Sequence, residues 1–176
     1  MVEYKKQGID LYVADTAIIK HPNEILLGNH VAIDHFVYIS TRANIGDYVH
    51  IAPNTTILGG KDSYLFMEHF SGISANCTIL CGSDDFTKGM TNPQVPIKYR
   101  NPKIGNVVLK RFSILGANCT IMPNVVLAEG SVVGANSVIT KDTEPWTVYV
   151  GSPAKPIKKR NKESILEPAS KMGYKK

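Results

Sequence analysis

Four ionisable side chains stand where the chain is expected to turn, and their types suit proton transfer. Asp84 and Asp85 open a long polar segment, Glu129 precedes a glycine, and His50 projects from an expected coil corner. Neighbouring carboxylates can raise one another's pKa, and histidine titrates near neutral pH without further tuning. These residues are therefore candidates for a general base or for substrate contacts. The structural alternative is an Asx turn for the aspartates and ordinary turn polarity for Glu129.

A six-residue period of aliphatic residues supplies the frame that must position these groups. Leu, Ile, Val or Met fills each in-frame position of three runs. Fixed-period similarity is the signature of a solenoid, and six is the period of the hexapeptide β-helix. Period six does not match the 3.6-residue helical repeat, so a helical interpretation fails. The in-frame positions are Leu27, Ile33, Ile39, Ile45, Ile51 and Ile57, then Met67, Ile73 and Ile79, then Leu109, Leu115, Ile121, Leu127, Val133 and Ile139.

Small or β-branched residues stand four positions after most of these aliphatic residues. Each hexapeptide is one short strand and one turn, and three of them make a triangular coil whose aliphatic residues stack inward. The small residue fits the crowded corner, where a larger side chain would overpack. We therefore predict an all-β parallel β-helix with one long protruding loop and a short C-terminal helix. The small positions are Val31, Val37, Ala43, Val49, Thr55, Ser71, Cys77, Ser113, Cys119, Val125, Ser131 and Ser137.

Breaks in the period divide the chain into three parts. Residues 1–18 are expected to cap one end of the solenoid, residues 19–141 to form its coils, and residues 142–176 to close the other end. A polar segment at 83–103 interrupts the coils. Long loops on regular scaffolds tend to carry function, so this loop is the expected site. The closing part is expected to hold a short helix around 158–166 and a basic tail.

The composition fits one globular domain. The chain has 176 residues, is 43% hydrophobic, and contains no apolar run near the ~18 residues that cross a membrane. Its first residues lack the apolar segment of a secretory signal, and its three cysteines do not suggest a disulfide framework. We therefore expect a cytoplasmic protein without a membrane span.

Positive charge is concentrated at the C-terminal end. The net charge is +5, and residues 155–176 hold eight basic residues against two glutamates. Such a patch can bind nucleic acid, a membrane surface or a phosphorylated cofactor, and it can also be a solvated tail. No base-reading or stacking module accompanies it, so nucleic acid is not expected as a partner.

Two segments besides the repeat carry a resemblance to a known family. The closing runs Ile139-Thr-Lys-Asp and Gly151-Ser-Pro-Ala-Lys-Pro-Ile resemble those of the left-handed β-helix acyltransferases, which include galactoside, maltose and xenobiotic acetyltransferases. The segments Cys81-Gly-Ser-Asp-Asp-Phe and Thr91-Asn-Pro resemble the branch that acts on sugars in cell-surface polysaccharide synthesis. That branch includes N-acyltransferases for nucleotide-linked amino sugars.

The resemblance implies left-handed coils, a homotrimer, and acetyl-CoA bound in the cleft between neighbouring prisms. The pantetheine arm would bond backbone groups of small residues, which permit close approach. The phosphates would meet lysines in charge-assisted contacts of ~1.5–3 kcal/mol each, although Lys141 and Lys155 also fit ordinary surface lysines. A backbone N–H near Gly116 would meet the oxyanion. The implied coenzyme contacts are Gly116, Ala117, Ala135, Lys141, Lys155 and Lys158.

The acceptor is expected to be an amine, because the better-known members carry a loop histidine and this chain has no histidine after His69. A deprotonated amine attacks a thioester readily and needs only a carboxylate to orient it, whereas a hydroxyl needs a base with a pKa nearer 7. Asp84 and Asp85 would then serve an amino-sugar acceptor, with Glu129 reaching the site of a neighbouring subunit. No metal is expected.

Three alternatives remain open at this point. A sugar O-acetyltransferase would use His50 or His35 as its base. A zinc enzyme like the γ-type carbonic anhydrases would use His30 and His35, whose five-residue spacing suits two ligands, with a further histidine from a neighbour. A non-catalytic scaffold would use the prism only for assembly.

Overall fold

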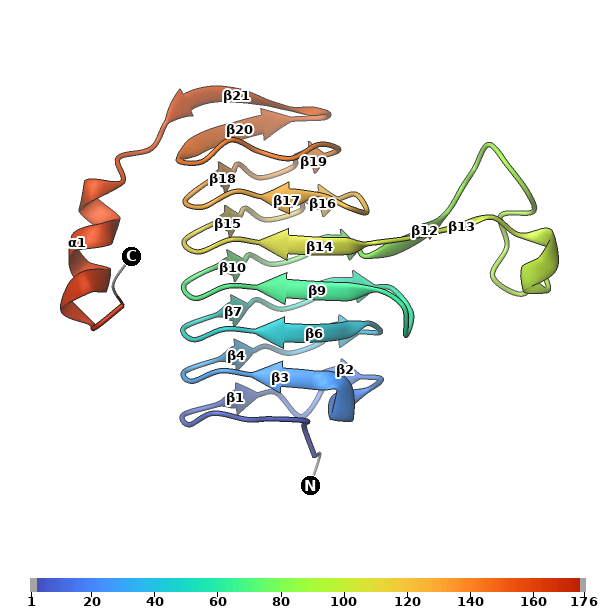
Figure 1. Ribbon diagram of the computed structural model, residues 1–176, viewed down its shortest axis with the longest axis horizontal. Coiled ribbons are helices and arrows are strands. Elements are labelled where there is room, and N and C mark those ends of the chain that lie inside the picture. Colours follow the sequence, from blue (N-terminus) through green and yellow to red (C-terminus); the bar gives the residue numbers. More distant parts are fainter. Residues whose placement is uncertain (1–2, 175–176) are drawn as a thin grey trace.

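Three parallel sheets wind around a common axis into a triangular prism (Figure 1). The computed structural model describes residues 3–174, so Lys175 and Lys176 of the basic tail lie outside it. The first sheet contains β1 (Tyr12–Val13), β4 (Ala32–Ile33), β7 (His50–Ile51), β10 (Gly72–Ile73), β15 (Ile114–Leu115), β18 (Val132–Val133) and β20 (Thr147–Gly151), to which β21 (Ala154–Lys159) adds in antiparallel orientation.

The other two sheets have the same parallel stacking. The second sheet contains β2 (Ile18–Ile19), β5 (Tyr38–Ile39), β8 (Thr56–Leu58), β11 (Thr78–Leu80), β16 (Thr120–Ile121) and β19 (Val138–Ile139). The third sheet contains β3 (Ile25–Leu27), β6 (Arg42–Ile45), β9 (Tyr64–Met67), β14 (Asn106–Leu109) and β17 (Val126–Leu127). The remaining elements are the short 3-10 turns η1 (Pro22–Glu24) and η2 (Ile97–Tyr99), the hairpin strands β12 (Gly82–Asp84) and β13 (Pro102–Ile104), and the helix α1 (Glu163–Lys171).

The six-residue period fixes the register of these sheets. Ile33 of β4 pairs with Ile51 of β7, which pairs with Ile73 of β10 and, through it, with Leu115 of β15. These side chains are buried, as are the small corner residues such as Val31 and Ser113. The inward column of aliphatic residues and its small corner positions are therefore confirmed. Among residues 3–174, no helix is long and apolar enough to span a membrane.

Three edges join the sheets. The aromatic edge links the third sheet to the first through turns 28–30, 46–48, 68–70, 110–112 and 128–130. The asparagine edge links the first sheet to the second through turns 34–36, 52–54, 74–76, 116–118 and 134–136. The loop edge links the second sheet to the third through residues 40–41, 59–63, 81–105 and 122–125.

The parallel stack extends beyond residues 19–141 at both ends. Val13 of β1 pairs with Ile33, and Tyr149 of β20 pairs with Val133, so the expected cap and closing segments each contribute a strand. At the start, Val13 and Ile19 keep the six-residue spacing. The extra residues of η1 then interrupt the period before β3, so the sequence pattern does not show that β1 and β2 belong to the same stack. At the end, the inward position is held by a tyrosine rather than an aliphatic residue.

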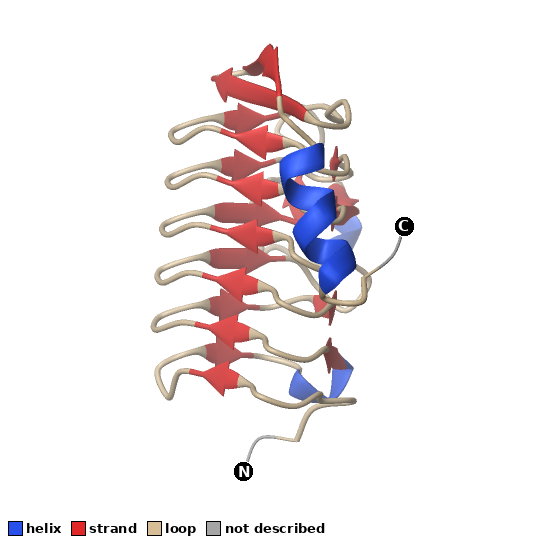
Figure 2. Ribbon diagram, turned by 90° about the vertical axis from the view of Figure 1, so that its left-hand side faces the viewer, coloured by secondary structure: helices blue, strands red, loops and turns tan. Residues whose placement is uncertain are grey.

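The C-terminal helix lies farther along the chain than residues 158–166. Residues 154–159 stay extended because β21 pairs with the free edge of β20. The helix α1 then starts after Asn161, whose Oδ1 accepts the N–H groups of Glu163 and Ser164. It runs alongside the aromatic edge (Figure 2). Tyr174 follows α1, and its ring stands edge-on to that of Phe70 at 4.7 Å.

Candidate active site

The long excursion is a hairpin arm that projects from the loop edge (Figure 1). Its stem is the antiparallel pair β12–β13, in which Asp84 stands opposite Pro102. The arm exposes apolar side chains to solvent beyond the stem. They are Phe86, Met90, Ile97 and Tyr99.

Asp84 faces a hollow at the base of this arm. Its Oδ1 accepts a hydrogen bond from Nη2 of Arg100 at 2.8 Å, and only 10% of the Asp84 side chain is exposed. The hollow holds about 420 Å³, and both residues line it together with glycines and serines of neighbouring coils. No histidine is among the described residues that line it. The site therefore offers a shielded carboxylate oriented by a fixed guanidinium.

Asp85 has a different environment from that of Asp84. Its Oδ1 accepts hydrogen bonds from the backbone N–H of Thr87 at 2.9 Å and from the hydroxyl of Thr87 at 2.6 Å. Its Oδ2 accepts a hydrogen bond from Nδ2 of Asn101 at 3.3 Å. The Thr87 hydrogen bonds, with help from Lys103, lower the pKa of Asp85 below its ordinary value. The expectation that the neighbouring carboxylates raise one another's pKa is therefore wrong for Asp85. Its side chain forms the Asx turn that starts the loop.

The turns of the asparagine edge hold the small residues expected to contact coenzyme A. The N–H groups of Ala117 and Ala135 donate to no acceptor among the described residues. The N–H of Gly116 donates to the carbonyl of Val133 at 2.8 Å, so Ala117 supplies the open donor near it. A Cβ on Gly116 would lie 2.7 Å from the backbone nitrogen of Ala135, so the spacing between coils requires this glycine.

Two of the three expected phosphate contacts come together. Lys141 and Lys155 line one hollow of about 260 Å³ between the end of the second sheet and β21. Lys158 is exposed farther along β21, opposite Val148 of β20. The hollow thus places two cationic side chains near the C-terminal end of the prism, beyond the turn that holds Ala135.

His50 forms a pair with a residue of the asparagine edge. Its Nε2 lies 2.8 Å from Oδ2 of Asp34, and 57% of the His50 side chain is exposed. A carboxylate that fixes one ring nitrogen leaves the other free for proton transfer. His50 lies in strand β7 rather than at the expected coil corner, and its pairing with Asp34 places it beside the asparagine edge, away from Asp84 on the loop edge.

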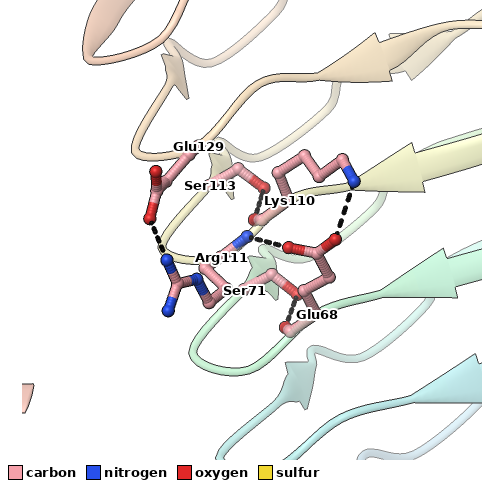
Figure 3. A network of polar contacts seen from close by, with 6 residues as sticks. All are labelled: Glu68, Ser71, Lys110, Arg111, Ser113 and Glu129. Carbon is pink, nitrogen blue, oxygen red and sulfur yellow. Dashed lines mark hydrogen bonds and ion pairs between the residues drawn. The ribbon is translucent and has the colours of Figure 1, made fainter. Parts of the chain in front are cut away.

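Glu129 lies on the aromatic edge, in the contact network of Figure 3. Its Oε1 accepts a hydrogen bond from Nη2 of Arg111 at 2.8 Å. The backbone N–H of Arg111 donates to Glu68, which also pairs with Lys110 at 2.8 Å. Within one chain, Glu129 is thus held by neighbours on its own edge, away from the loop edge.

The two histidines of the zinc alternative stand on different edges. Nδ1 of His30 lies 2.8 Å from Asp10, and its ring stacks on Tyr48 at the aromatic edge. His35 belongs to the asparagine edge, where Nδ1 lies 2.8 Å from Oγ1 of Thr16. Residues 3–174 contain no group of three or more His, Cys, Asp or Glu able to hold a metal ion.

The cysteines are free thiols inside the prism. Desolvation by burial raises the pKa of Cys77 to about 11 and that of Cys81 to about 12, and it raises the pKa of Cys119 as well. Burial thus disfavours the thiolate, which is the reactive form of a cysteine.

Sequence analysis did not identify the residues that pair with Asp84 and His50. Arg100 joins Asp84 across a separation of 16 residues, and Asp34 joins His50 across the same separation. For the second pair a signal exists, because residues about one coil apart share an edge. For the first pair the register of β12 and β13 decides the contact, and no periodic pattern encodes that register.

Short coils around an aliphatic column, with an arm that projects from one edge, define a hexapeptide β-helix. The model of the family "Bacterial transferase hexapeptide (six repeats)" matches residues 24–59 and 101–141. A dTDP-4-amino-4,6-dideoxy-D-glucose acyltransferase of Escherichia coli is 34% identical over 95% of this chain and 91% of its own length. The chain belongs to the hexapeptide-repeat family of acyltransferases, and its coils are left-handed.

Two further relatives are named for different reactions. A putative lipopolysaccharide biosynthesis O-acetyl transferase of Escherichia coli K12, WbbJ, is 30% identical over 88% of this chain and 79% of its own length. A crystal structure of a variant of AntD, an N-acyltransferase from Bacillus cereus in complex with dTDP and coenzyme A, has a TM-score of 0.91 at 35% identity. The match covers 97% of this chain and 93% of that chain.

Proposed function

We propose that this enzyme transfers an acyl group, acetyl in the simplest case, from acyl-CoA to the amine of a nucleotide-linked amino sugar. The observation that carries the proposal is the shielded Asp84–Arg100 pair in a hollow whose described lining lacks a histidine. A carboxylate suits an amine acceptor better than a hydroxyl acceptor. The dTDP and coenzyme A bound to AntD, and the amino-sugar acyltransferase of E. coli, support the same substrates.

In the proposed reaction, the acceptor amine attacks the carbonyl carbon of the thioester. Asp84 accepts a hydrogen bond from the amine, orients its lone pair and receives the excess proton. The N–H of Ala117 donates to the carbonyl oxygen while negative charge develops there. The C–S bond then breaks, and the coenzyme A thiolate leaves with a proton returned by Asp84.

Coenzyme A binds along the asparagine edge in this proposal. The open N–H group of Ala135 faces a pantetheine amide, while that of Ala117, beside Gly116, faces the thioester carbonyl at the reactive end of the coenzyme. Its phosphates reach Lys141 and Lys155 in their shared hollow, with Lys158 nearby on β21. The order of the residues along the prism supports this placement, because the hollow is lined by Ile139, which follows the Ala135 turn, and by Tyr149 of the next coil.

The complete site lies between copies of the chain in a homotrimer. Asp84 stands on the loop edge and the coenzyme turns on the asparagine edge, with the second sheet between them. A neighbouring prism can bring these edges together, and the apolar residues Phe86, Met90 and Tyr99 of the arm offer it a contact surface. Asp85 then holds the arm, whereas Glu129, paired with Arg111 on the aromatic edge, has no part in this arrangement of the site. Sedimentation equilibrium should give three times the chain mass.

The enzyme is proposed to work in the cytoplasm. Its three cysteines are free and buried, which suits a reducing compartment.

The decisive experiment is a mass-spectrometric screen of acetyl-CoA and longer acyl-CoAs against nucleotide-linked amino sugars and neutral glycosides. We expect one acyl mass to be added to a nucleotide-linked amino sugar, with free coenzyme A released in equal amount. Acylation of neutral glycosides alone would contradict the proposal.

A second candidate function is sugar O-acetylation, favoured by the His50–Asp34 pair at 2.8 Å and by the E. coli O-acetyl transferase relative. It predicts that His50→Ala lowers turnover severely on a hydroxyl acceptor. With an amine acceptor, the same substitution should have a mild effect.

A further inference from the structure

One turn of the asparagine edge departs from the others. The third position of each turn has a positive φ, and Asn54, Asn76, Asn118 and Asn136 hold it with φ of 57 to 59°. Asparagine tolerates this left-handed region better than most residues. Phe36 holds the same position one coil earlier, with φ of 60°. The sequence therefore places a strained aromatic residue where its own repeat prefers asparagine.

Packing within the chain does not account for this phenylalanine. On the aromatic edge, Phe112 has the same positive φ, but its ring stacks on that of Phe70 at 5.2 Å and only 6% of the residue is exposed. Phe36 is 64% exposed. An exposed ring at a strained backbone position points to function rather than to stability.

The surroundings of Phe36 form a small, fixed aromatic platform. Nδ1 of His35 lies 2.8 Å from Oγ1 of Thr16, and its Nε2 lies 3.2 Å from the hydroxyl of Tyr12. The His35 ring centroid is 6.1 Å from that of Phe36 and 6.5 Å from that of Tyr12. The backbone N–H of Phe36 also donates to Thr16. The rings of Tyr12 and His35 are thus held by side-chain hydrogen bonds, and the backbone of Phe36 is held beside them, which leaves its ring exposed to a ligand.

The platform lies on the same edge as the proposed coenzyme contacts. Hydrogen bonds between successive turns, such as Asn54 N to His35 O and Asn136 N to Ala117 O, stack the turns in one column. Three coils, or ~14 Å at ~4.8 Å each, separate the Phe36 turn from the Ala117 turn. Coenzyme A extends from Ala117 toward one end of the prism, so the other direction is open to the acceptor.

We propose that Tyr12, His35 and Phe36 bind the heteroaromatic base of the nucleotide-linked sugar, with the base stacked on Phe36. This inference rests on the proposed function and adds the residues that hold the nucleotide end of the acceptor. Base stacking on aromatic side chains is tolerant of base identity, so both thymine and uracil fit the platform.

The test is calorimetric binding of dTDP, UDP and coenzyme A to the intact protein and to Phe36→Asn. The variant should fold, because asparagine holds this position in the following coils. We expect its Kd for either nucleoside diphosphate to rise about tenfold or more, with the coenzyme A affinity unchanged. Phe36→Tyr should retain binding within about threefold. Ile9→Ser, a control at a 69% exposed apolar residue that precedes the aromatic edge, should bind like the parent protein.

Three results would overturn the inference. Unchanged nucleotide binding by Phe36→Asn would show that Phe36 does not contact the base, while the proposed function would stand. A changed sedimentation mass for that variant would assign Phe36 to an interface between copies. Absence of nucleoside diphosphate binding by the parent protein, together with acylation of other sugars, would remove the proposed function and this inference together.

Discussion

The aromatic edge and the asparagine edge use the same backbone geometry with opposite results. Both have a positive φ at the third position of each turn. The aromatic edge fills that position with Tyr48, Phe70 and Phe112, whose rings stack at 5.1 and 5.2 Å, and Tyr174 covers them. The asparagine edge fills it with short polar residues that leave the backbone open.

The residue type at this turn position therefore decides whether an edge contributes to stability or to ligand binding. Stacked rings close an edge by excluding water from its turns, and Arg160 adds hydrogen bonds to the carbonyls of Phe112 and Gly130. Asparagine and alanine give up that packing but expose N–H groups to a ligand. If this division is correct, substitutions on the open edges should change activity, and those on the aromatic edge should change stability.

The largest effect is expected on the loop edge, at Asp84. Asp84→Asn keeps the shape of the side chain but removes the proton acceptor, so turnover should fall about 10²–10⁴-fold with coenzyme A affinity nearly intact. Steady-state kinetics and calorimetry measure the two quantities. Asp85→Asn is the matched control, since its carboxylate serves Thr87, and it should change turnover only a few-fold. Full turnover by Asp84→Asn with weaker coenzyme binding would show that the assigned role is wrong.

The next effect concerns the stability of the covered edge. Phe112→Ala removes a buried ring from the stack and should lower the free energy of unfolding by about 3 kcal/mol. Phe36→Ala changes the same turn position on the open edge and should cost less than about 0.5 kcal/mol. Urea denaturation compares the two variants directly. Equal losses would contradict the distinction between the edges.

A smaller effect is expected where coenzyme A contacts the open edge. Ala135→Phe places a bulky ring on an exposed turn, so the Kd for coenzyme A should rise about tenfold, or ~1.4 kcal/mol, through steric exclusion. The thermal midpoint should stay within a degree or two because Ala135 packs against little. Unchanged coenzyme affinity would remove Ala135 from the binding surface.

The smallest effect is expected at Tyr174, whose ring packs against the aromatic edge. Desolvation, together with the hydrogen bond to Asp47 at 2.8 Å, raises the pKa of Tyr174 to about 12. Its contribution to stability is full below the unfolded pKa of about 10 and is lost as pH rises through about 12. Tyr174→Phe should cost about 1 kcal/mol at pH 8, and the difference from the parent should shrink above pH 10.

Sequence periodicity predicts the frame of this protein well but the site only in part. The spacing of residues such as Ile33, Ile51 and Ile73 encodes the register, because each coil repeats the same inward position. The same counting assigns turn residues to edges, and it would have separated Glu129 from Asp84. It does not predict the Arg100 contact, which depends on the hairpin stem of the arm.

The antiparallel strand β21 also determines how the solenoid ends. A parallel stack that stopped at β20 would present unpaired N–H and C=O groups, on which another prism could continue the sheet. Instead β21 covers that strand with exposed lysines and Pro156, a composition that discourages edge-to-edge growth. Lys155 and Lys158, proposed above to bind coenzyme A, also place positive charge on this edge, so their neutralisation is expected to promote self-association, which light scattering measures separately from coenzyme binding.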